Sequence, residues 1–468
     1  HYCHAMAAVA ISPFTRSLIV VMDGAGTQAT DFSKGHFETK YLPSAKKNRY
    51  EECTVYLQEG AKLTTVFKRW QEFRTGEERA NYPGWTMSEG LGIFYEESAK
   101  YIFNSIREAG KVMGLSPYGK PTPVKDRLEF LKSLDWDESF KGKGKKAWEN
   151  SGRFKDYANM AASVQAHFEQ DLFAILKKLN RMYPDVRDLI FTGGCALNCI
   201  GNMKILYNGY FDRVYIPPFP SDECIAFGAA YGNFLAKHPE RWSPLDWSEQ
   251  IGNYGPKRSV PNLKAMQETF KDFWVHQPDE ICEFTAEQLA KKKLIAWFQG
   301  RSESGPRALG NRSILARVDV PGLKDHMNAK VKGREAFRPY GSTCLLEKAS
   351  EYFEVPPGFE SPFMSFAPRV RPKFKQALSE VTHVNGTSRI QTVSRSQNPR
   401  MWALIQAVGR KTGIHCVLNT SLNVMGQPIV ETMQDAKRFL EQTPVDGLVI
   451  GDLFVSKKPL SKPSRDRA

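Results

Sequence analysis

The sequence predicts an α/β fold for this 468-residue chain, divided into two domains. The main observation is a recurring order in which a short apolar run ends in a glycine, proline or aspartate turn and leads into a helical pattern. This order is typical of strands whose ends border a ligand cleft. The second observation is size, because 468 residues with 41% apolar content exceed one typical domain and can bury more than one core.

The first domain is expected to cover residues 1–270, and three strand units support it. Residues 17–26 (SLIVVMDGAG) form an apolar run that stops in a tight turn. Residues 186–198 (VRDLIFTGGCALN) continue from a strand through a Gly-Gly break into a helix. Residues 213–230 (RVYIPPFPSDECIAFGAA) repeat this order.

Regular patterns weaken over residues 240–285, and we place the linker at residues 271–285. A second α/β domain is expected over residues 286–460. Its first strand is predicted at 293–299 (KLIAWFQ), and a later strand and turn are predicted at 414–430 (IHCVLNTSLNVMGQPIV).

The formal net charge of +14 leaves nucleic acid, an anionic surface and small anionic substrates open as partners. The basic segments 141–148 (KGKGKKAW) and 461–468 are interpreted as a solvated loop and a flexible tail. Eight scattered cysteines without a CxxC pair indicate free thiols in a reducing compartment. Neither a membrane helix nor a signal peptide is found in the pattern, so a cytoplasmic protein without a membrane partner is expected.

The candidate metal ligands are His4, Asp23 and Asp222. Both aspartates stand where a predicted strand gives way to a turn, a position from which a side chain faces the cleft. An imidazole and two carboxylates suit a divalent ion with open coordination positions, such as iron, manganese or zinc. Residue types alone favour ordinary structural roles: a turn former at Asp23, a helix N-cap at Asp222 and a surface helix residue at His4.

The Gly-Gly break is a candidate phosphate or ribose site. Gly193 and Gly194 let a ligand approach the backbone, and the helix that begins near Asn198 offers free N–H groups at its N-terminus. The alternative is a plain strand-to-helix turn, because the Lys-Ser pair of a P-loop is absent. The loop at 110–121 (GKVMGLSPYGKP) leaves the same two interpretations open.

Cationic residues cluster in two segments of the second domain. Such clusters favour a nucleotide or acyl-phosphate site over a solvated surface, because guanidinium groups bind phosphate and carboxylate bidentately. The clustered residues are Arg301, Arg307, Arg312, Lys330, Lys332, Arg334 and Arg338, with Arg389, Asn419, Thr420 and Ser421 placed to complete the site. No serine or cysteine nucleophile motif is found, so covalent catalysis through the protein is not predicted.

Together these segments resemble the family of O-carbamoyltransferases that act on antibiotics, nodulation factors and related natural products. The resemblance covers almost the whole chain and rests on motifs in the family's order: HAMAAVAISPF, VVMDGAG, GKVMGLSPYGKP, TGGCALN, DECIAFGAA, GRSESGPRALGNRSILA, KGREAFRPYG, GTSRIQTV and LNTSLNVMGQPIVETMQDA. It implies an ATPase-fold domain of the actin, Hsp70 and sugar-kinase type, similar to that of the universal tRNA threonylcarbamoyl-transfer enzyme, followed by a YrdC-like α/β domain.

The resemblance also implies two reaction steps. The YrdC-like domain joins carbamoyl phosphate and ATP into carbamoyl adenylate and releases pyrophosphate. The first domain then transfers the carbamoyl group to a hydroxyl of a small natural product or glycan, near a divalent metal that is usually iron. The residues implied are catalytic Lys332, Arg338, Arg307, Arg389 and Ser421, cofactor contacts Gly193, Gly194, Asn198, Arg301 and Asn419, and metal ligands His4, Asp23 and Asp222. A homodimer is left open.

The chain departs from the family pattern at several positions. The family has further residues before the position of His1, including another histidine, so the resemblance implies that the start of the first domain and one metal ligand are absent. Cys195 and Cys224 stand where the family tends to carry an aliphatic residue and a glycine. Two other functions stay open: a tRNA threonylcarbamoyl-type modification protein, which the domain order and the lack of RNA-binding motifs do not favour, and a non-catalytic ATP-binding module.

Overall fold

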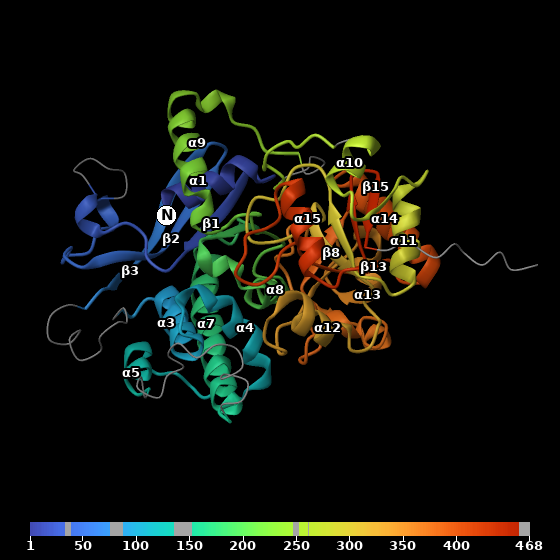
Figure 1. Ribbon diagram of the computed structural model, residues 1–468. Helices are drawn as coiled ribbons and strands as arrows, with labels where there is room; N and C mark the ends of the chain where they lie inside the picture. Colours follow the sequence, from blue (N-terminus) through green and yellow to red (C-terminus); the bar gives the residue numbers. More distant parts are fainter. Residues whose placement is uncertain (33–38, 75–87, 135–151, 247–251, 261, 458–468) are drawn as a thin grey trace, which may run out of the picture. The chain divides into compact units, whose positions relative to one another are not determined.

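A computed structural model of the chain describes residues 1–32, 39–74, 88–134, 152–246, 252–260 and 262–457. The chain has the predicted mixed α/β fold and divides into two compact units (Figure 1). Unit 1 comprises residues 1–247 with 365–367, and unit 2 comprises residues 248–364 and 368–468. The basic segment 141–148 and the predicted tail 461–468 lie outside the described residues.

Unit 1 is built on a five-stranded sheet with the order β3-β2-β1-β4-β5. The strands are β1 (Arg16–Met22), β2 (Arg49–Glu59), β3 (Lys62–Glu72), β4 (Asp188–Thr192) and β5 (Arg213–Tyr215). The helices are α1 (Tyr2–Ile11), α3 (Leu91–Phe103), α4 (Ala109–Leu115), α5 (Arg127–Lys132), α7 (Phe154–Met182), α8 (Cys199–Tyr207) and α9 (Ile225–Lys237). Three of these strands, β1, β4 and β5, confirm the predicted strand units.

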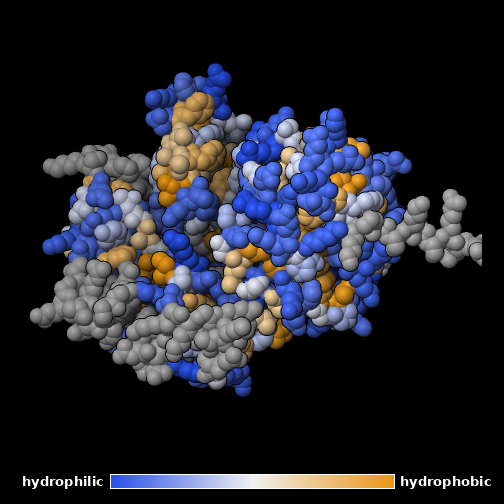
Figure 2. Space-filling model, in the orientation of Figure 1, coloured by the Kyte–Doolittle hydropathy of each residue, from blue (hydrophilic) through white to orange (hydrophobic). Residues whose placement is uncertain are grey.

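The site of unit 1 lies where β1 and β4 end. These strands are parallel, and Val21 lies opposite Thr192, so the residues that follow them meet at one edge of the sheet. α1 packs against α9 near this edge, and a Cβ at Gly228 of α9 would lie 1.8 Å from the Cys3 carbonyl oxygen. The other face of α9 exposes apolar side chains, among them Phe227 and Phe234. Figure 2 shows apolar surface along this helix.

Unit 2 contains an eight-stranded sheet with the order β12-β9-β13-β8-β7-β14-β15-β6, and a two-stranded sheet of β10 and β11. The strands are β6 (Trp274–His276), β7 (Ile295–Phe298), β8 (Arg312–Ala316), β9 (Gly341–Leu345), β10 (Phe353–Glu354), β11 (Arg369–Val370), β12 (Ile390–Val393), β13 (Cys416–Ser421), β14 (Gly447–Ile450) and β15 (Leu453–Ser456). The helices are α10 (Leu263–Thr269), α11 (Ile281–Ala290), α12 (Leu323–His326), α13 (Ala349–Tyr352), α14 (Pro399–Thr412) and α15 (Met433–Gln442). The predicted strands at 293–299 and 414–430 are confirmed as β7 and β13.

The boundary between the units lies at residues 247 and 248, earlier than the predicted end of the first domain at residue 270. The difference has a structural reason. The segment predicted to be linker at 271–285 supplies β6 and the start of α11, and β6 pairs with β15 at the edge of the large sheet. α11 and α14 contribute Ile281, Leu289 and Leu404 to the same core as Trp297 of β7.

Two sequence-level expectations about the whole chain can be compared with the structure. All eight cysteines are free thiols, as predicted. Within the described part of the chain, no helix combines the length and the apolar character needed to cross a bilayer.

A largely buried ion network ties the β2–β3 hairpin, which the sequence did not predict, to α5 and α7. Arg69 of β3 contacts Glu52 and Asp171 at 2.7 Å each, and Arg127 contacts the same carboxylates at 3.1 and 2.7 Å. Burial acts to raise the pKa of Asp171, but the hydrogen bond and charge of Arg69 and the charge of Arg127 outweigh it and lower this pKa. The hairpin therefore depends on charge pairing as well as on apolar packing.

Asp171→Asn is expected to lower the free energy of unfolding by about 3 kcal/mol at pH 7, because two largely buried arginines lose a charged partner. The carboxylate stabilises the fold fully above its unfolded pKa of 3.8, and this contribution is lost as the pH falls through the lower pKa of the folded state. The difference between variant and parent should therefore shrink in acid. Urea unfolding at pH 7 and pH 3 measures it.

Asp185→Asn is the matched control for this prediction. Asp185 pairs with Arg16 at 2.7 Å on the surface, where ion pairs contribute little, so the urea midpoint should stay nearly unchanged. Equal destabilisation by the two substitutions would contradict the importance of the buried network.

Candidate metal centre and cationic site

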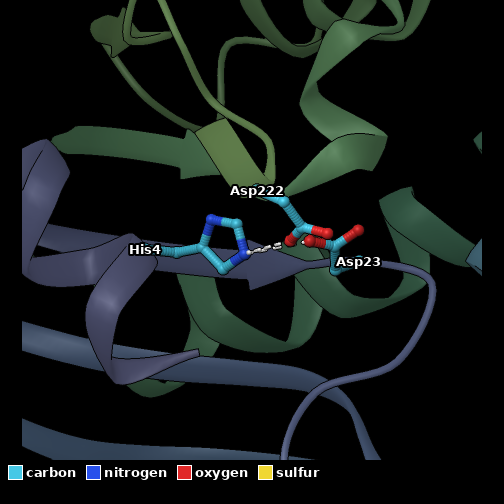
Figure 3. Close-up of side chains that lie close together, drawn as sticks. All are labelled: His4, Asp23 and Asp222. Atoms are coloured by element: carbon cyan, nitrogen blue, oxygen red, sulfur yellow. Dashed lines mark ion pairs between the residues drawn. The ribbon is translucent and has the colours of Figure 1, made fainter. Parts of the chain in front are cut away.

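Three side chains from distant parts of the sequence meet at the edge of the unit 1 sheet (Figure 3). His4 lies on α1, Asp23 directly follows β1, and Asp222 stands just before α9. His4 Nε2 lies 2.9 Å from Asp23 Oδ2 and 3.5 Å from Asp222 Oδ1. Ligand atoms of all three lie within 4.8 Å of one another, and this is the one such group among the described residues. The structure thus brings together the three residues predicted as metal ligands.

The group has a buried side and an open side. His4 and Asp23 are 2% and 15% exposed, whereas Asp222 is 80% exposed. Burial acts to raise the pKa of Asp23, but the hydrogen bond and charge of His4, together with the backbone N–H groups of Gly24 and Gly194, lower it below its ordinary value. An ionised carboxylate therefore lies beside an imidazole nitrogen, an arrangement that can hold a divalent cation and stays open to solvent at Asp222.

Two further side chains near this group were not assigned to it from the sequence. Cys224 is 1% exposed, and its Sγ lies 3.2 Å from His4 Nδ1, so the thiol bonds the ring nitrogen that faces away from the carboxylates. Burial and the charges of Asp23, Glu97 and Asp222 raise the pKa of Glu96 on α3 to about 7. No sequence motif identifies Glu96 as part of the site. Cys224 could have been assigned to the site because it stands only two residues after Asp222.

The Gly-Gly turn supports the same group. Gly193 has a φ angle of +89°, and a Cβ at Gly194 would lie 2.8 Å from Asp23 Oδ1. The close approach lets the Gly194 backbone N–H bond to Asp23. Asn198 accepts a bond from the Gly201 N–H at 2.9 Å, which caps α8, and also pairs with the Gln165 amide. The turn thus positions Asp23 and α8, and its nucleotide contacts stay a prediction.

A second group lies in unit 2, where β13 ends. Lys332 is 4% exposed, and its Nζ donates to the carbonyl and to Oγ of Ser421, the latter at 3.2 Å. Nζ also lies 2.9 Å from the Asn423 carbonyl oxygen and 2.8 Å from Asn423 Oδ1. The predicted pair of Lys332 and Ser421 is therefore in contact. Asn423 was not predicted. It stands two residues after Ser421, directly beyond the end of β13, and a second polar residue at this spacing could have indicated it.

Arginines raise the positive potential around Lys332. Burial, followed by the charges of Arg334 and Arg338, lowers the pKa of Lys332 well below its ordinary value. Burial also lowers the pKa of Arg334 to about 10, with contributions from Arg338 and Arg389. We call these four residues, Lys332, Arg334, Arg338 and Arg389, the cation cluster. Their mutual repulsion in a poorly solvated place is relieved by an anion, so the cluster can bind phosphate or carboxylate groups.

The other predicted residues of unit 2 have contacts of a different kind. Arg301 is exposed and donates to the Gly255 carbonyl at 2.8 Å. Asn419 is buried in the sheet, where its amide donates to the Ala308 carbonyl at 3.2 Å and to Thr343 Oγ1 at 2.9 Å. The half-buried Arg307 directly precedes Ala308 and so lies next to this contact.

Arg312 differs from its predicted place in a phosphate site. Its side chain is fully buried, and its guanidinium stacks 3.5 Å from the ring centroid of Phe298. Its Nη1 donates to the Gln299 carbonyl at 2.6 Å and its Nη2 to the Gly300 carbonyl at 3.2 Å. Arg312 therefore holds the end of β7 in place, because its hydrogen-bonding groups point at the backbone of that turn.

Comparison with known proteins follows the same division of the chain. The family profile described as Carbamoyltransferase N-terminus matches residues 1–231, and the profile described as Carbamoyltransferase C-terminus matches residues 286–457. Nodulation protein NolO of Bradyrhizobium diazoefficiens is 33% identical over 98% of this chain and 79% of its own length. Nodulation protein NolNO of Sinorhizobium fredii is also 33% identical over 98% of this chain, which spans 64% of that protein.

Among solved structures, full-length HypF in the phosphate- and nucleotide-bound form aligns with 13% identity and a TM-score of 0.25, over 39% of this chain and 22% of that one. This likeness is too weak to carry any argument about fold or function.

Proposed function

This chain belongs to the carbamoyltransferase family, and from this premise we propose that it acts in two steps. Unit 2 forms carbamoyl adenylate from ATP and carbamoyl phosphate, and unit 1 transfers the carbamoyl group to a hydroxyl of a small natural product or glycan. In this proposal unit 1 is an ATPase-like domain of the actin, Hsp70 and sugar-kinase type, and unit 2 is a YrdC-like domain.

The buried Lys332 is the observation that supports the first step most directly. An ammonium group that is 4% exposed and surrounded by arginines is costly to keep, unless a polyanionic ligand binds next to it. ATP and carbamoyl phosphate bring many negatively charged oxygens into one place. When no ligand is bound, Ser421 and Asn423 at the end of β13 accept the hydrogen bonds that the amino group of Lys332 donates.

The chemistry of the first step assigns a role to the cation cluster. Water releases carbamate and inorganic phosphate from carbamoyl phosphate, a carbamate oxygen bonds to the α-phosphorus of ATP, and pyrophosphate leaves. Lys332, Arg334 and Arg338 bind the phosphate oxygens and stabilise the charge that builds up on the leaving pyrophosphate. Fixed donors of this kind need no reorganisation during the reaction, which is why they lower the barrier.

For the second step, we propose that His4, Asp23 and Asp222 hold a divalent metal ion. Their donor set of one imidazole nitrogen and two carboxylates fits iron, manganese or zinc. When bound, such an ion supplies Lewis-acid polarisation of the carbamoyl carbonyl and the acceptor hydroxyl. The acceptor oxygen bonds to the carbamoyl carbon, the bond between that carbon and the phosphate oxygen breaks so that AMP leaves, and the hydroxyl proton is released to solvent. The low pKa of Asp23 keeps that carboxylate charged throughout.

Incubation of the purified chain with ATP and carbamoyl phosphate tests the proposal. We expect mass spectrometry to detect carbamoyl adenylate, and labelled pyrophosphate to exchange into ATP only when carbamoyl phosphate is present. A reaction without carbamoyl phosphate is the control. The proposal fails if neither the adenylate nor the dependent exchange is observed with protein that is folded and binds ATP.

Cys224→Ala is expected to weaken divalent metal binding by about tenfold or more, because the thiol orients the imidazole of His4. With a metal held by His4 at Nε2, the ring proton would lie on Nδ1 and would be donated to Cys224 Sγ. Burial and neighbouring carboxylates raise the pKa of Cys224 to about 12, so it accepts as a neutral thiol. Titration with Co²⁺ in competition with a chelator measures the affinity.

Two matched variants show whether orientation is the cause. Cys224→Ser keeps an acceptor at the same position and should retain most of the affinity. Cys199→Ala removes another buried thiol, on α8, and should change nothing. Equal Co²⁺ affinity in the parent and in Cys224→Ala would remove Cys224 from this role.

A further inference from the structure

The loop at residues 303–311 of unit 2 folds around the carboxylate of Glu303. This loop lies between β7 and β8, and the Glu303 side chain is buried, with 8% exposed. Its Oε1 accepts the backbone N–H groups of Leu309 at 2.7 Å and Asn311 at 2.8 Å, and both oxygens accept the N–H of Arg312 at 3.2 Å. Neither the sequence motifs nor the two-step reaction described above assigns a role to this carboxylate.

The buried carboxylate and the loop conformation depend on each other. Burying a carboxylate is costly unless hydrogen bonds replace the lost water, and here backbone N–H groups of the same loop supply them. Such bonds to a carboxylate are stronger than bonds between neutral groups. Gly310 has a φ angle of +102°, which lets the backbone turn so that the residues on both of its sides donate to one oxygen. The first part of the loop therefore fixes the course of its last part.

Three buried polar side chains of the sheet bind the carbonyl groups of the same loop. Gln391 of β12 donates to the Leu309 carbonyl at 2.8 Å, and Asn419 of β13 donates to the Ala308 carbonyl at 3.2 Å. Thr343 of β9 joins the two, because its hydroxyl donates to Gln391 Oε1 at 2.8 Å and accepts from the Asn419 amide at 2.9 Å. The loop backbone is therefore fixed from two sides before any ligand binds.

The loop brings Arg307 over the same face of β13 as the buried Lys332. Asn419 and Ser421 are two residues apart on β13, so their side chains lie on one face, about 7 Å apart along the strand. Asn419 contacts the Ala308 carbonyl, and Lys332 Nζ donates to Ser421 Oγ at 3.2 Å. The side chain of Arg307, which directly precedes Ala308 and is half-buried, is long enough to cover this distance.

We infer that Glu303 is a positioning residue, which folds the loop so that Arg307 meets the phosphate groups bound beside Lys332. The inference rests on the proposed function, because it takes ATP and carbamoyl phosphate as the ligands of this site. It adds that the guanidinium is in place before the phosphates arrive. A donor already in position needs no reorganisation during the reaction, whereas a displacement of about 1 Å can slow a reaction by about 100-fold.

A double-mutant cycle tests the inference through the exchange of labelled pyrophosphate into ATP with carbamoyl phosphate present. Glu303→Leu keeps the approximate size of the side chain but releases the loop, and should slow exchange by about 100-fold. Arg307→Met should slow it at least as much. Because Glu303 acts through Arg307, adding Glu303→Leu to Arg307→Met should change the rate little. Glu303→Gln keeps Oε1 as an acceptor and should restore most of the rate.

Glu380→Leu is the matched control. Glu380 is also 8% exposed, and its Oε2 accepts the backbone N–H of Lys324 at 2.7 Å, at the start of α12. Both leucine variants lose a buried carboxylate that binds backbone N–H groups, so both should lower the thermal midpoint. Only Glu303→Leu should slow pyrophosphate exchange, because the loop that carries Arg307 is unaltered in Glu380→Leu.

Four results would overturn the inference. Glu303→Leu could exchange pyrophosphate at the parent rate, Glu303→Gln could be as slow as Glu303→Leu, or Glu380→Leu could slow the exchange equally. The fourth result is a further loss of about 100-fold when Glu303→Leu is added to Arg307→Met. That loss would show that the carboxylate acts on the fold as a whole and not through Arg307.

A failure of the proposed function gives a different pattern, in which the parent shows no exchange that depends on carbamoyl phosphate. The positioning role is then decided by calorimetry with inorganic pyrophosphate as the probe. The parent should bind it, Glu303→Leu should bind it about tenfold more weakly, and Glu303→Leu should cause no further loss in the Arg307→Met protein. Equal pyrophosphate affinity in the parent and in Glu303→Leu would contradict the inference, as would a parent that does not bind pyrophosphate.

Discussion

Replacing Lys332 by methionine is expected to slow carbamoyl adenylate formation by about 100- to 1,000-fold. The ammonium group lies at the end of β13, in contact with Ser421 and Asn423, and two arginines stand close enough to depress its pKa. Methionine keeps an unbranched apolar side chain of similar length and removes the charge together with the hydrogen bonds that Nζ donates to Ser421 and Asn423. Exchange of labelled pyrophosphate into ATP, measured with saturating carbamoyl phosphate, gives the rate.

Lys330→Met is the matched control for this prediction. Lys330 lies two residues earlier on the same turn and is exposed, so its removal should leave the exchange rate unchanged. The thermal midpoint of both variants should be recorded, because a buried lysine also affects stability. Normal exchange in folded Lys332→Met protein would show that this residue does not take part in adenylate formation.

Replacing His4 by alanine is expected to have the second large effect, confined to the transfer step. The imidazole supplies the one nitrogen ligand of the group, so metal affinity should fall by more than about 100-fold, beyond the loss caused by an outer-shell substitution. Transfer to an acceptor hydroxyl should be lost with it, whereas adenylate formation should continue at the parent rate. Metal analysis after dialysis and the pyrophosphate exchange assay measure the two properties separately.

His238→Ala serves as the control, because this imidazole is exposed at the end of α9. It should retain both metal and transfer. An unchanged metal content in His4→Ala would remove His4 from the site, and loss of pyrophosphate exchange in the same variant would contradict the assignment of the two steps to separate units.

The parts of the fold that could be predicted are those that local pattern decides. β1, β4 and β7 are continuous apolar runs bounded by turn residues, and a buried strand of this kind can be predicted from a single sequence. The β2–β3 hairpin cannot be recognised in the same way, because β3 (KLTTVFKRWQE) is neither a continuous apolar run nor a strict alternation of apolar and polar residues. The charged side chains of the hairpin pair with α5 and α7, through Glu52 of β2 with Arg127 and through Arg69 of β3 with Asp171, and no local pattern reveals such partners.

The same difference between local sequence pattern and tertiary contacts explains which site residues could be predicted. Asp23 and Asp222 could be chosen because strand ends point into clefts, and His4 because an imidazole joins two carboxylates in a ligand set that suits a divalent ion. Cys224 contacts His4, and Glu96 lies near the carboxylates of Asp23 and Asp222; only tertiary packing creates these contacts. Arg312 shows the opposite case: its arginine-rich surroundings favoured phosphate binding, but packing places it under Phe298, with its hydrogen-bonding groups directed at the backbone.

The contact between α1 and α9 has a consequence for how the metal group behaves. Gly228 allows the two helices to touch, His4 directly follows the Cys3 carbonyl that faces this glycine, and Asp222 stands just ahead of α9. Local opening of α1 therefore removes a ligand, and an ion bound by His4 and Asp222 restrains that opening in return. With the proposed ion bound, opening of the first helix and loss of the ion would occur together, so transfer should fail on heating before adenylate formation does.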